Sequence, residues 1–383
     1  MKNYRVLHIV VCLGTGGVET LLLNLQRRLP EHVRFDYLVA QNDVRDAEAE
    51  KRGSQIFVIP DKKRAPWKHP GLVAELIEKH RYRVVHFHRF AFGGAILGTA
   101  WRWGVPVRIA HSHSTGFQES GVLKNVLYSA YHRTVNRFLL NRHATNILAC
   151  SNEAGRFLMG PLWNRSAKCR PLFNGIELGK FSGERSPEIR SALCERYGIP
   201  SDALVVGSFG RMTPAKNQAF LLRVFAELAA RDSRYVLFIG GEGELHGELT
   251  RQAEELGLKN RVFLPGFCPN AAELLGNLFD VFCLPSLTEG FGLGLIEATA
   301  SGLFSVCSRN IPNELVERFP DTMLALSLDA SPSRWADALN EGIERRISSE
   351  KGRNLVGEQS LTVDAMLKTL LKIYEGSFEN QIS

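Results

Sequence analysis

Short apolar runs of strand length alternate with helical patterns along most of this chain. In its first half these runs lie at 5–11, 35–40, 56–59, 83–88, 107–112 and 145–150. Between the first two, apolar residues at 18, 21, 22, 25 and 29 repeat with the spacing of one helix face. Such an alternation of strands and helices predicts a parallel sheet whose two faces are both covered by helices.

The alternation stops once and then resumes. Ser, Gly, Pro and charged residues collect over 181–200, and new strand-like runs follow at 203–209, 235–239, 262–264, 281–284 and 304–307. At 383 residues the chain is also longer than one hydrophobic core usually serves. The sequence therefore predicts an α/β protein with two Rossmann-like, doubly wound parallel-sheet domains, 1–180 and 201–360, joined by a linker at 181–200 and facing across a cleft. A helix at about 361–378 is expected to pack back on the first domain.

The composition is that of a folded globular protein, with 44% hydrophobic and 23% charged residues. The sequence contains no run of about 20 apolar residues, and its start lacks the cleavage site of a secretory signal. The seven cysteines are scattered without a CxxC pair, which favours reduced thiols. We therefore expect a cytoplasmic protein.

Charge is divided unevenly along the chain. Residues 1–180 hold 27 Lys and Arg against 13 Asp and Glu, a net charge of +14, whereas the remainder carries −7. A long helix predicted at 122–142 mixes basic and apolar side chains, namely Lys124, Arg133, Arg137 and Arg142 with Leu123, Val126, Leu127, Phe138 and Leu139. A basic amphipathic helix can lie on anionic lipid, so peripheral contact with the inner face of the plasma membrane is one interpretation. A solvated basic surface is the other.

One motif follows the first strand of each predicted domain, at the end of the strand where ligands of such sheets bind. The segment Gly14-Thr15-Gly16-Gly17-Val18-Glu19 opens a helix whose free N–H groups suit phosphate or carboxylate, although a tight turn without a ligand is the alternative. In the second domain Arg211 and Lys216 lie five residues apart in the loop 208–217. A guanidinium and an ammonium at this spacing suit two phosphate groups.

The most specific motif covers 284–298. A buried strand breaks at Pro285, a glycine-rich turn follows, and a helix begins between Glu289 and Glu297, which are separated by seven residues. Backbone N–H groups of the turn can face a diphosphate at the helix start. Glu297, about one turn into the helix, can accept hydrogen bonds from ribose hydroxyls, and Glu289 would reach the sugar side of the diphosphate.

Two histidine pairs stand at strand ends. His86 and His88 share one side of a strand, and His111 and His113 share one side of the next. Because no carboxylate or cysteine stands at a helpful spacing, the pattern predicts no metal site. Either these histidines contact a ligand, or they hydrogen-bond to the backbone.

In combination, these motifs resemble the retaining GT-B glycosyltransferases of family 4. The resemblance rests on Gly16-Gly17-Val18-Glu19, on Gly210-Arg211-x4-Lys216 and on Glu289-x7-Glu297. It extends in order over nearly the whole chain, through 174–177, 240–244 and 264–267. Within the family, the chain is most similar to enzymes that build capsular and exopolysaccharide repeat units.

This resemblance implies a hexosyltransferase that moves a sugar from a nucleotide diphosphate donor, with a UDP-sugar favoured, to a glycan or lipid-linked acceptor with retention of configuration. Arg211 and Lys216 would act in catalysis by stabilising the donor diphosphate, so that no cofactor or metal is expected. Glu289 and His113, or His111 in its place, would contact the transferred sugar. The other donor contacts would come from Glu297 to the ribose, the backbone of Phe291, Gly292 and Leu293, the loop at Phe267 and Cys268, and Gly16 and Gly17.

Two further functions stay open at this point. A GT-B nucleotide-sugar epimerase would share the fold but turn over its donor without an acceptor, and the Glu-x7-Glu pattern argues against it. A non-catalytic protein would instead bind nucleic acid or membrane through the basic half. Aromatic residues are not interleaved with those charges as base stacking requires, so no nucleic-acid partner is expected.

Overall fold

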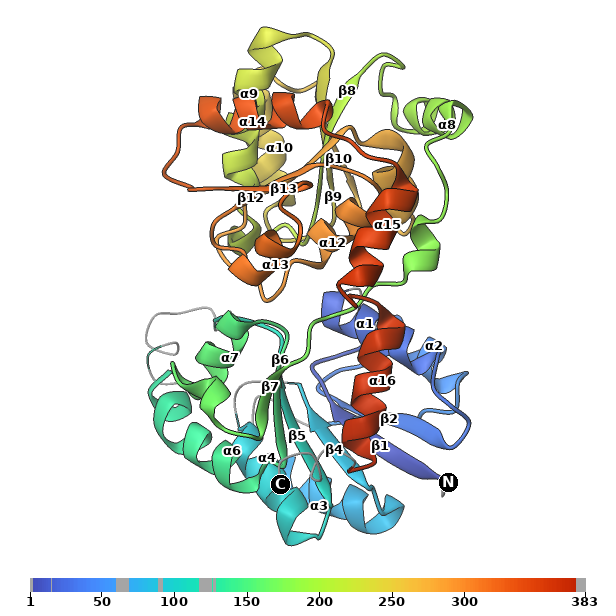
Figure 1. Cartoon of the computed structure of the whole chain (residues 1–383), viewed down its shortest axis with the longest axis vertical. Coiled ribbons are helices and arrows are strands. Elements are labelled where there is room, and N and C mark those ends of the chain that lie inside the picture. The colour runs from blue at the N-terminus through green and yellow to red at the C-terminus, as the bar shows by residue number, and fades with distance from the viewer. Residues whose placement is uncertain are drawn as a thin grey trace. The chain divides into compact units, whose positions relative to one another are not determined.

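The structure of the chain is a computed structural model that describes residues 3–14, 16–59, 69–88, 92–116, 126 and 129–376. It divides into two compact units. The first comprises the chain up to Gly175 together with the segment from Val363 onward, and the second spans Ile176–Thr362. Figure 1 shows each unit as a sheet flanked by helices. The segment 181–200, expected as a linker, lies within the second unit and contains the helix α8 (Pro187–Tyr197).

The first unit is built on a seven-stranded parallel sheet with the order β3-β2-β1-β4-β5-β6-β7. Its strands are β1 (Tyr4–Ile9), β2 (Val33–Val39), β3 (Ile56–Val58), β4 (Val84–Phe87), β5 (Val107–Ser112), β6 (Asn146–Ala149) and β7 (Cys169–Pro171). The strand order reverses between β1 and β4, so the topological switch point of this sheet, where ligands of doubly wound sheets bind, lies between those two strands.

The helices of the first unit cover both faces of this sheet (Figure 1). They are α1 (Gly17–Gln26), α2 (Asp46–Glu50), α3 (His69–His80), α4 (Gly93–Arg102), η2 (His132–Asn136), α6 (Arg137–His143), α7 (Asn152–Met159), η3 (Trp163–Arg165) and α16 (Val363–Tyr374). The last helix, α16, packs beside α1 and contributes Met366, Leu370 and Tyr374 to the core of this unit. Ser151 caps α7, because its hydroxyl accepts a hydrogen bond from the Ala154 N–H at 3.0 Å.

The second unit has a six-stranded sheet with the order β10-β9-β8-β11-β12-β13, and its pairings are also parallel. Its strands are β8 (Leu204–Phe209), β9 (Tyr235–Gly240), β10 (Val262–Gly266), β11 (Val281–Leu284), β12 (Ser305–Ser308) and β13 (Met323–Leu326). Besides α8, the helices are η4 (Leu178–Phe181), η5 (Pro214–Lys216), α9 (Gln218–Arg231), α10 (His246–Glu255), α11 (Ala271–Glu273), η6 (Leu274–Leu278), α12 (Leu293–Ala300), α13 (Asn313–Arg318), α14 (Pro332–Ile343) and α15 (Ser349–Glu358). The switch point here lies between β8 and β11.

Each unit has a hydrophobic core of its own, which is what allows two sheets to form in one chain. Trp335 and Phe225 are fully buried in the second core, and Phe35 and Tyr37 in the first. All seven cysteines are free thiols, as expected. Within the described ranges, no helix has both the length and the apolar character that crossing a bilayer requires.

Candidate functional site

The carboxyl ends of β8 and β11 meet at the switch point of the second sheet, and the loops that follow them are tied together. Leu287 donates its backbone N–H to the carbonyl of Ala215 at 2.8 Å. The side-chain amide of Asn217 donates to the carbonyl of Pro285 at 3.1 Å. Two motifs far apart in the sequence therefore form one structural element at the place where such sheets bind ligands.

Lys216 and Glu289, one from each of these loops, form an ion pair between the ammonium and Oε1 of the carboxylate. The same carboxylate oxygen accepts a hydrogen bond from the Ser286 hydroxyl at 2.7 Å. Both side chains are largely shielded from solvent, with 25% of Lys216 and 10% of Glu289 exposed. The structure therefore brings these two residues into direct contact, which the sequence did not predict.

The loop that carries Arg211 is held by backbone contacts with the loop after β9. Gly210 donates its N–H to Gly240 at 3.1 Å, and Met212 donates to Glu242 at 2.8 Å. A Cβ on Gly241 would lie 2.2 Å from the carbonyl oxygen of Gly210, and its φ is +138°, so this approach requires glycine. Arg211 itself is exposed, and its guanidinium makes no ion pair with any residue that the structure describes. The guanidinium of Arg211 is therefore held at the surface on a loop fixed by backbone hydrogen bonds, where an anionic ligand can reach it.

Helix α12 begins beside the Lys216–Glu289 pair, after a turn that only glycine favours. Gly292 is its N-cap, with φ +97°, and no side chain caps the helix start. The free N–H groups of this first turn and the positive end of the helix dipole therefore remain available to an anion. The side chain of Phe291 is buried, so that residue can offer a ligand only its backbone.

Glu297 lies one turn into α12 and is partly buried. Burial raises the pKa of its carboxyl to about 7, against the opposing effect of the positive charge of Lys180. Within the described part of the chain, its carboxylate accepts no hydrogen bond from a protein group. A desolvated carboxylate without donors is destabilised by the fold alone and would gain from hydroxyl donors on a ligand.

Phe267 and Cys268 follow β10 at the same edge of the second sheet. The Phe267 ring is 51% exposed, which is unusual for a phenylalanine and leaves its face open to stacking. Cys268 is half-buried, its thiol donates to the carbonyl of Gly266 at 3.5 Å, and burial raises the pKa of that thiol.

In the first unit, Gly16 and Gly17 lie at the N-terminus of α1, and no side chain caps that helix either.

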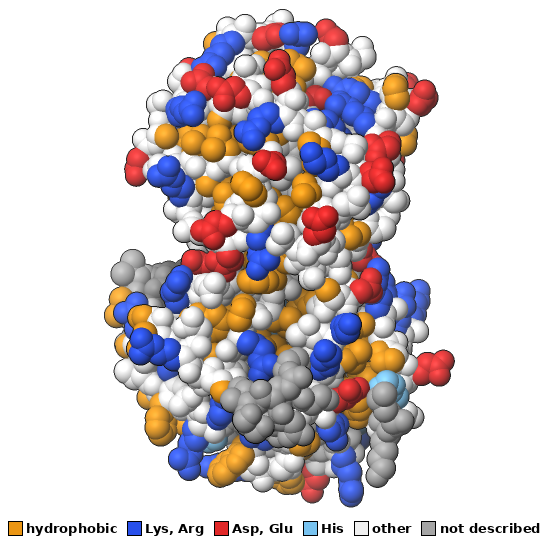
Figure 2. All heavy atoms as spheres, viewed as in Figure 1, with side chains coloured by type: hydrophobic (Ala, Val, Ile, Leu, Met, Phe, Trp, Pro, Cys, Tyr) orange, Lys and Arg blue, Asp and Glu red, His pale blue; other side chains and the backbone are white. Residues whose placement is uncertain are grey.

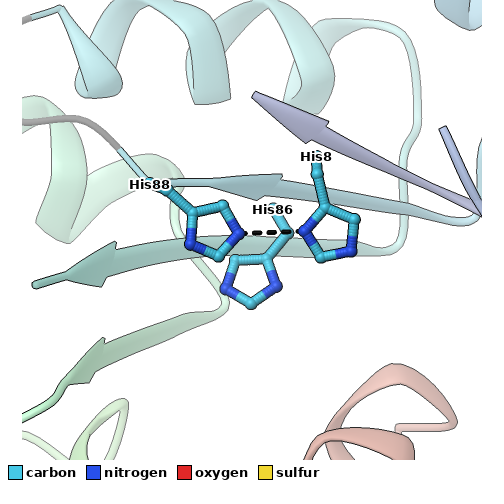
Figure 3. A group of neighbouring side chains, drawn as sticks. All are labelled: His8, His86 and His88. Atoms are coloured by element: carbon cyan, nitrogen blue, oxygen red, sulfur yellow. Dashed lines mark hydrogen bonds between the residues drawn. The ribbon is translucent and has the colours of Figure 1, made fainter. Parts of the chain in front are cut away.

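Five histidines lie together at the switch point of the first sheet. Four of them are the two pairs noted in the sequence, and the fifth comes from a third strand. His8 on β1 stands in register with His86 on β4. Its Nδ1 is 2.9 Å from Nε2 of His88, and Nδ1 of His88 is 2.9 Å from Nε2 of His113. Figure 3 shows the first of these hydrogen bonds, between His8 and His88.

A second chain of hydrogen bonds crosses the same cluster. Nε2 of His86 lies 3.2 Å from Nδ1 of His111, and Nδ1 of His86 lies 2.9 Å from the Tyr374 hydroxyl on α16. Burial lowers the pKa of all five imidazoles, to about 3 for His8 and about 4 for His113. The rings are therefore neutral at physiological pH and bond to one another rather than to the backbone.

Comparisons with known proteins identify the family to which this chain belongs. Residues 15–180 match the family model Glycosyltransferase Family 4, and residues 190–360 match Glycosyl transferases group 1. The Bacillus subtilis protein EpsF, assigned as a glycosyltransferase, is 34% identical over 88% of this chain and 86% of its own length. A UDP-Gal:α-D-GlcNAc-diphosphoundecaprenol α-1,3-galactosyltransferase of Escherichia coli is 29% identical over 61% of this chain and 59% of its own length.

Among solved structures, Anabaena HepE in complex with UDP and glucose aligns with a TM-score of 0.79 at 19% identity and covers 98% of this chain and 100% of its own. The fold, the two family matches and the similarity to EpsF show that the chain is a glycosyltransferase of the GT-B class. More specifically, the chain belongs to glycosyltransferase family 4, and EpsF is a relative to which it is similar over most of its length.

Proposed function

We propose that this enzyme transfers a hexosyl group from a nucleoside diphosphate sugar, with a UDP-sugar favoured, to a glycan or lipid-linked acceptor in cell-surface polysaccharide synthesis, with retention of configuration. The observation that carries the proposal is the group of donor-binding features at one sheet edge: Arg211, the Lys216–Glu289 pair, the start of α12 and Glu297. The printed names of the relatives support it. The Escherichia coli relative uses UDP-Gal and a diphosphoundecaprenol-linked acceptor, and HepE was solved with UDP and glucose.

The chemistry follows from the charges at this edge. As the bond to the sugar breaks, negative charge grows on the departing diphosphate. Arg211, Lys216 and the N–H groups of Gly292 and Leu293 would stabilise that charge, so we propose that no divalent ion is needed there. Glu297 would accept hydrogen bonds from the ribose, and the exposed ring of Phe267 would stack on the base.

The transferred sugar would lie against Glu289 and a histidine of the first unit. His113 is the more exposed member of its pair and His111 is 2% exposed, which favours His113 for direct contact. Gly16 and Gly17, at the uncapped start of α1, would approach the same diphosphate from the first unit.

An epimerase would use the donor site without an acceptor. Donor turnover that depends on an added acceptor therefore distinguishes transfer from epimerisation.

Nucleotide binding is the direct test of this proposal. Calorimetric titration with UDP, GDP and ADP is expected to show one nucleoside diphosphate binding at pH 8. Because the ionised carboxylate of Glu297 is a stronger hydrogen-bond acceptor than the protonated acid and burial places its pKa at about 7, affinity should fall as the pH is lowered to 6, by up to about tenfold per pH unit. Glu297→Ala should remove both the tight binding and its pH dependence, whereas Glu341→Ala, an exposed position on α14, should change neither. A chain that binds none of the three nucleotides would contradict the proposal.

Peripheral membrane contact is a second part of the proposal, carried by the outer side of η2 and α6. Val135 and Phe138 are exposed, Phe138 by 65%, next to the exposed Arg133. Figure 2 shows Lys and Arg side chains beside hydrophobic ones on this unit. Arg137, by contrast, donates to the carbonyl oxygens of Phe157 and Leu158, so it stabilises the fold. Of the predicted basic helix, residues 122–125, 127 and 128 lie outside the described part.

Vesicle flotation tests this contact. Vesicles containing phosphatidylglycerol are expected to bind the protein, and pure phosphatidylcholine vesicles are not, because the attraction is partly electrostatic. Arg133→Ala and Phe138→Ala should each weaken binding several-fold, and raising the salt concentration should weaken it in the wild type. Equal binding to both vesicle types would show that the charge of this surface has no role.

A further inference from the structure

We propose that His88, His111 and His113 form a binding site for a transition-metal ion of the Zn²⁺ type in the first unit. The three side chains come from the ends of the neighbouring strands β4 and β5, and one ring nitrogen of each lies within 4.8 Å of the others. His111 and His113 are two residues apart, so they share one side of β5. Three neutral imidazoles with a fourth position left for water are a donor set that zinc uses in proteins. Occupation of this site does not require the proposed transfer reaction, but an ion on His113 would leave that ring without a free nitrogen for the transferred sugar, so the two roles of His113 exclude each other.

One of the three nitrogen pairs has nearly the spacing of an ion site, and the ring of His111, whose centroid is 4.0 Å from that of His113, would have to turn its nitrogen toward this pair to complete the site. Nδ1 of His88 and Nε2 of His113 are 2.9 Å apart. In a tetrahedral zinc site with bonds of 2.0–2.1 Å, two ligand nitrogens are about 3.3 Å apart. In His111, Nδ1 is bonded to His86, whereas Nε2 is buried and has no hydrogen-bond partner among the described residues. An ion between Nδ1 of His88 and Nε2 of His113 would displace the proton that these atoms share, and the proton would move to the outer nitrogen of the same ring, which keeps both rings neutral. Nε2 of His111 would be the third ligand.

Each proposed ligand also has a partner for its other nitrogen. Nε2 of His88 faces Nδ1 of His8, and Nδ1 of His111 faces Nε2 of His86. Asn174, whose buried Oδ1 lacks a partner in the described part of the chain, lies beside His113. If each ligand carries its N–H on that outer nitrogen, the inner nitrogens hold the lone pairs a metal needs, and no ring has to change its charge. Such outer contacts orient metal-binding histidines and tune their affinity.

The neighbouring group of His8, His86 and His88 is less suitable, although its nitrogens are equally close. Both nitrogens of His86 are already used, by His111 and by the Tyr374 hydroxyl. Figure 3 shows the His86 ring to one side of the hydrogen bond between His8 and His88. We therefore assign His8 and His86 to the outer contacts, with Tyr374 behind His86, and the ion to the other three histidines.

Metal binding by the full chain tests the assignment. Protein without a polyhistidine tag, stripped with a chelator, is titrated with Zn²⁺ in competition with a chromophoric chelator, and with Co²⁺ in the visible spectrum. We expect one ion per chain with submicromolar affinity. His111→Asn should lower the affinity at least 100-fold. His86→Asn, which removes the outer partner of His111, should lower it about tenfold. His246→Asn, an exposed histidine of α10, should leave it unchanged.

The Co²⁺ spectrum keeps the test decisive if His111→Asn does not fold. A d–d band of a nitrogen-ligated, four- or five-coordinate ion supports the site, whereas a thiolate-to-cobalt charge-transfer band would place the ion on cysteines and overturn it. Failure of the wild-type chain to take up one ion, or an affinity unchanged in a folded His111→Asn protein, would also overturn it. The histidines would then be a hydrogen-bonded network alone. Because no nucleotide is present, either result is independent of the donor site.

Discussion

Glu297→Gln is expected to stabilise the protein at pH 8 while removing its tight nucleotide binding. Burial raises the pKa of Glu297 to about 7, so the folded state holds its proton more tightly than the unfolded chain does. The stability from this group is therefore fully present below the unfolded pKa of about 4.5 and is lost as the pH rises through about 7. A shift of this size corresponds to at most about 3 kcal/mol, and less where solvent reaches the carboxylate. Glutamine has no charge to desolvate, but it cannot replace an anionic acceptor for two ribose hydroxyls.

Thermal or denaturant unfolding from pH 4.5 to 8 measures this prediction. The difference in stability between the variant and the wild type should be near zero at pH 4.5 and should grow to its full value by pH 8. Glu341→Gln, at an exposed position of α14, is the matched control and should show no such growth. A Glu297→Gln protein that is less stable than the wild type at pH 8, or that binds nucleotide equally well, would contradict this account. Stabilisation together with loss of nucleotide binding would show that Glu297 serves ligand binding and lowers the stability of the fold.

Much of the fold could be predicted from the sequence, because strands buried on both faces appear as continuous apolar runs. The strand expected at 107–112 matches β5, and the run at 281–284 matches β11. The edge strand β7 was not predicted because Arg170 and Pro171 interrupt its apolar pattern, and β13 was not because its residues, Met-Leu-Ala-Leu, are equally common in helices. The segment 181–200 was predicted to be a linker because of its polar composition, and the helix within it was not predicted. Ser186 nevertheless caps α8, a helix with only Leu193 and Cys194 buried.

The candidate site divides in the same way. Arg211, Lys216 and Glu289 could be proposed as site residues because each follows a strand end near a glycine or proline, and Glu297 because it stands eight positions after Glu289 in the first helix beyond that turn. The hydrogen-bond partners of these residues could not be predicted, since they depend on how strands distant in sequence pair. His8 was missed for this reason: it is a single histidine within a strand, and only the pairing of β1 with β4 brings it beside His86 and His88.

Lys216→Ala is expected to reduce kcat by about 10² to 10³, the effect of removing one strong donor from a site where negative charge develops. In the structure, the ammonium is paired with Glu289, which also accepts a hydrogen bond from the Ser286 hydroxyl. An incoming diphosphate would compete for Lys216 and leave Glu289 free to face the sugar. The substitution should also lower the free energy of unfolding by about 1 to 3 kcal/mol, because it leaves a largely buried carboxylate without its cation.

A double-mutant cycle separates these two effects. For stability, Glu289→Gln should offset much of the loss caused by Lys216→Ala, because the neutral amide does not need a cation, and the coupling should be about 0.5 to 3 kcal/mol. For transfer, the second substitution should offset nothing, because the diphosphate still lacks its ammonium. Lys259→Ala, which breaks an exposed ion pair with Glu254, is the matched control and should change each quantity little. If Glu289→Gln restored transfer to Lys216→Ala, the lysine would act by holding Glu289 in place, and the diphosphate charge would have to be stabilised by Arg211 and the start of α12.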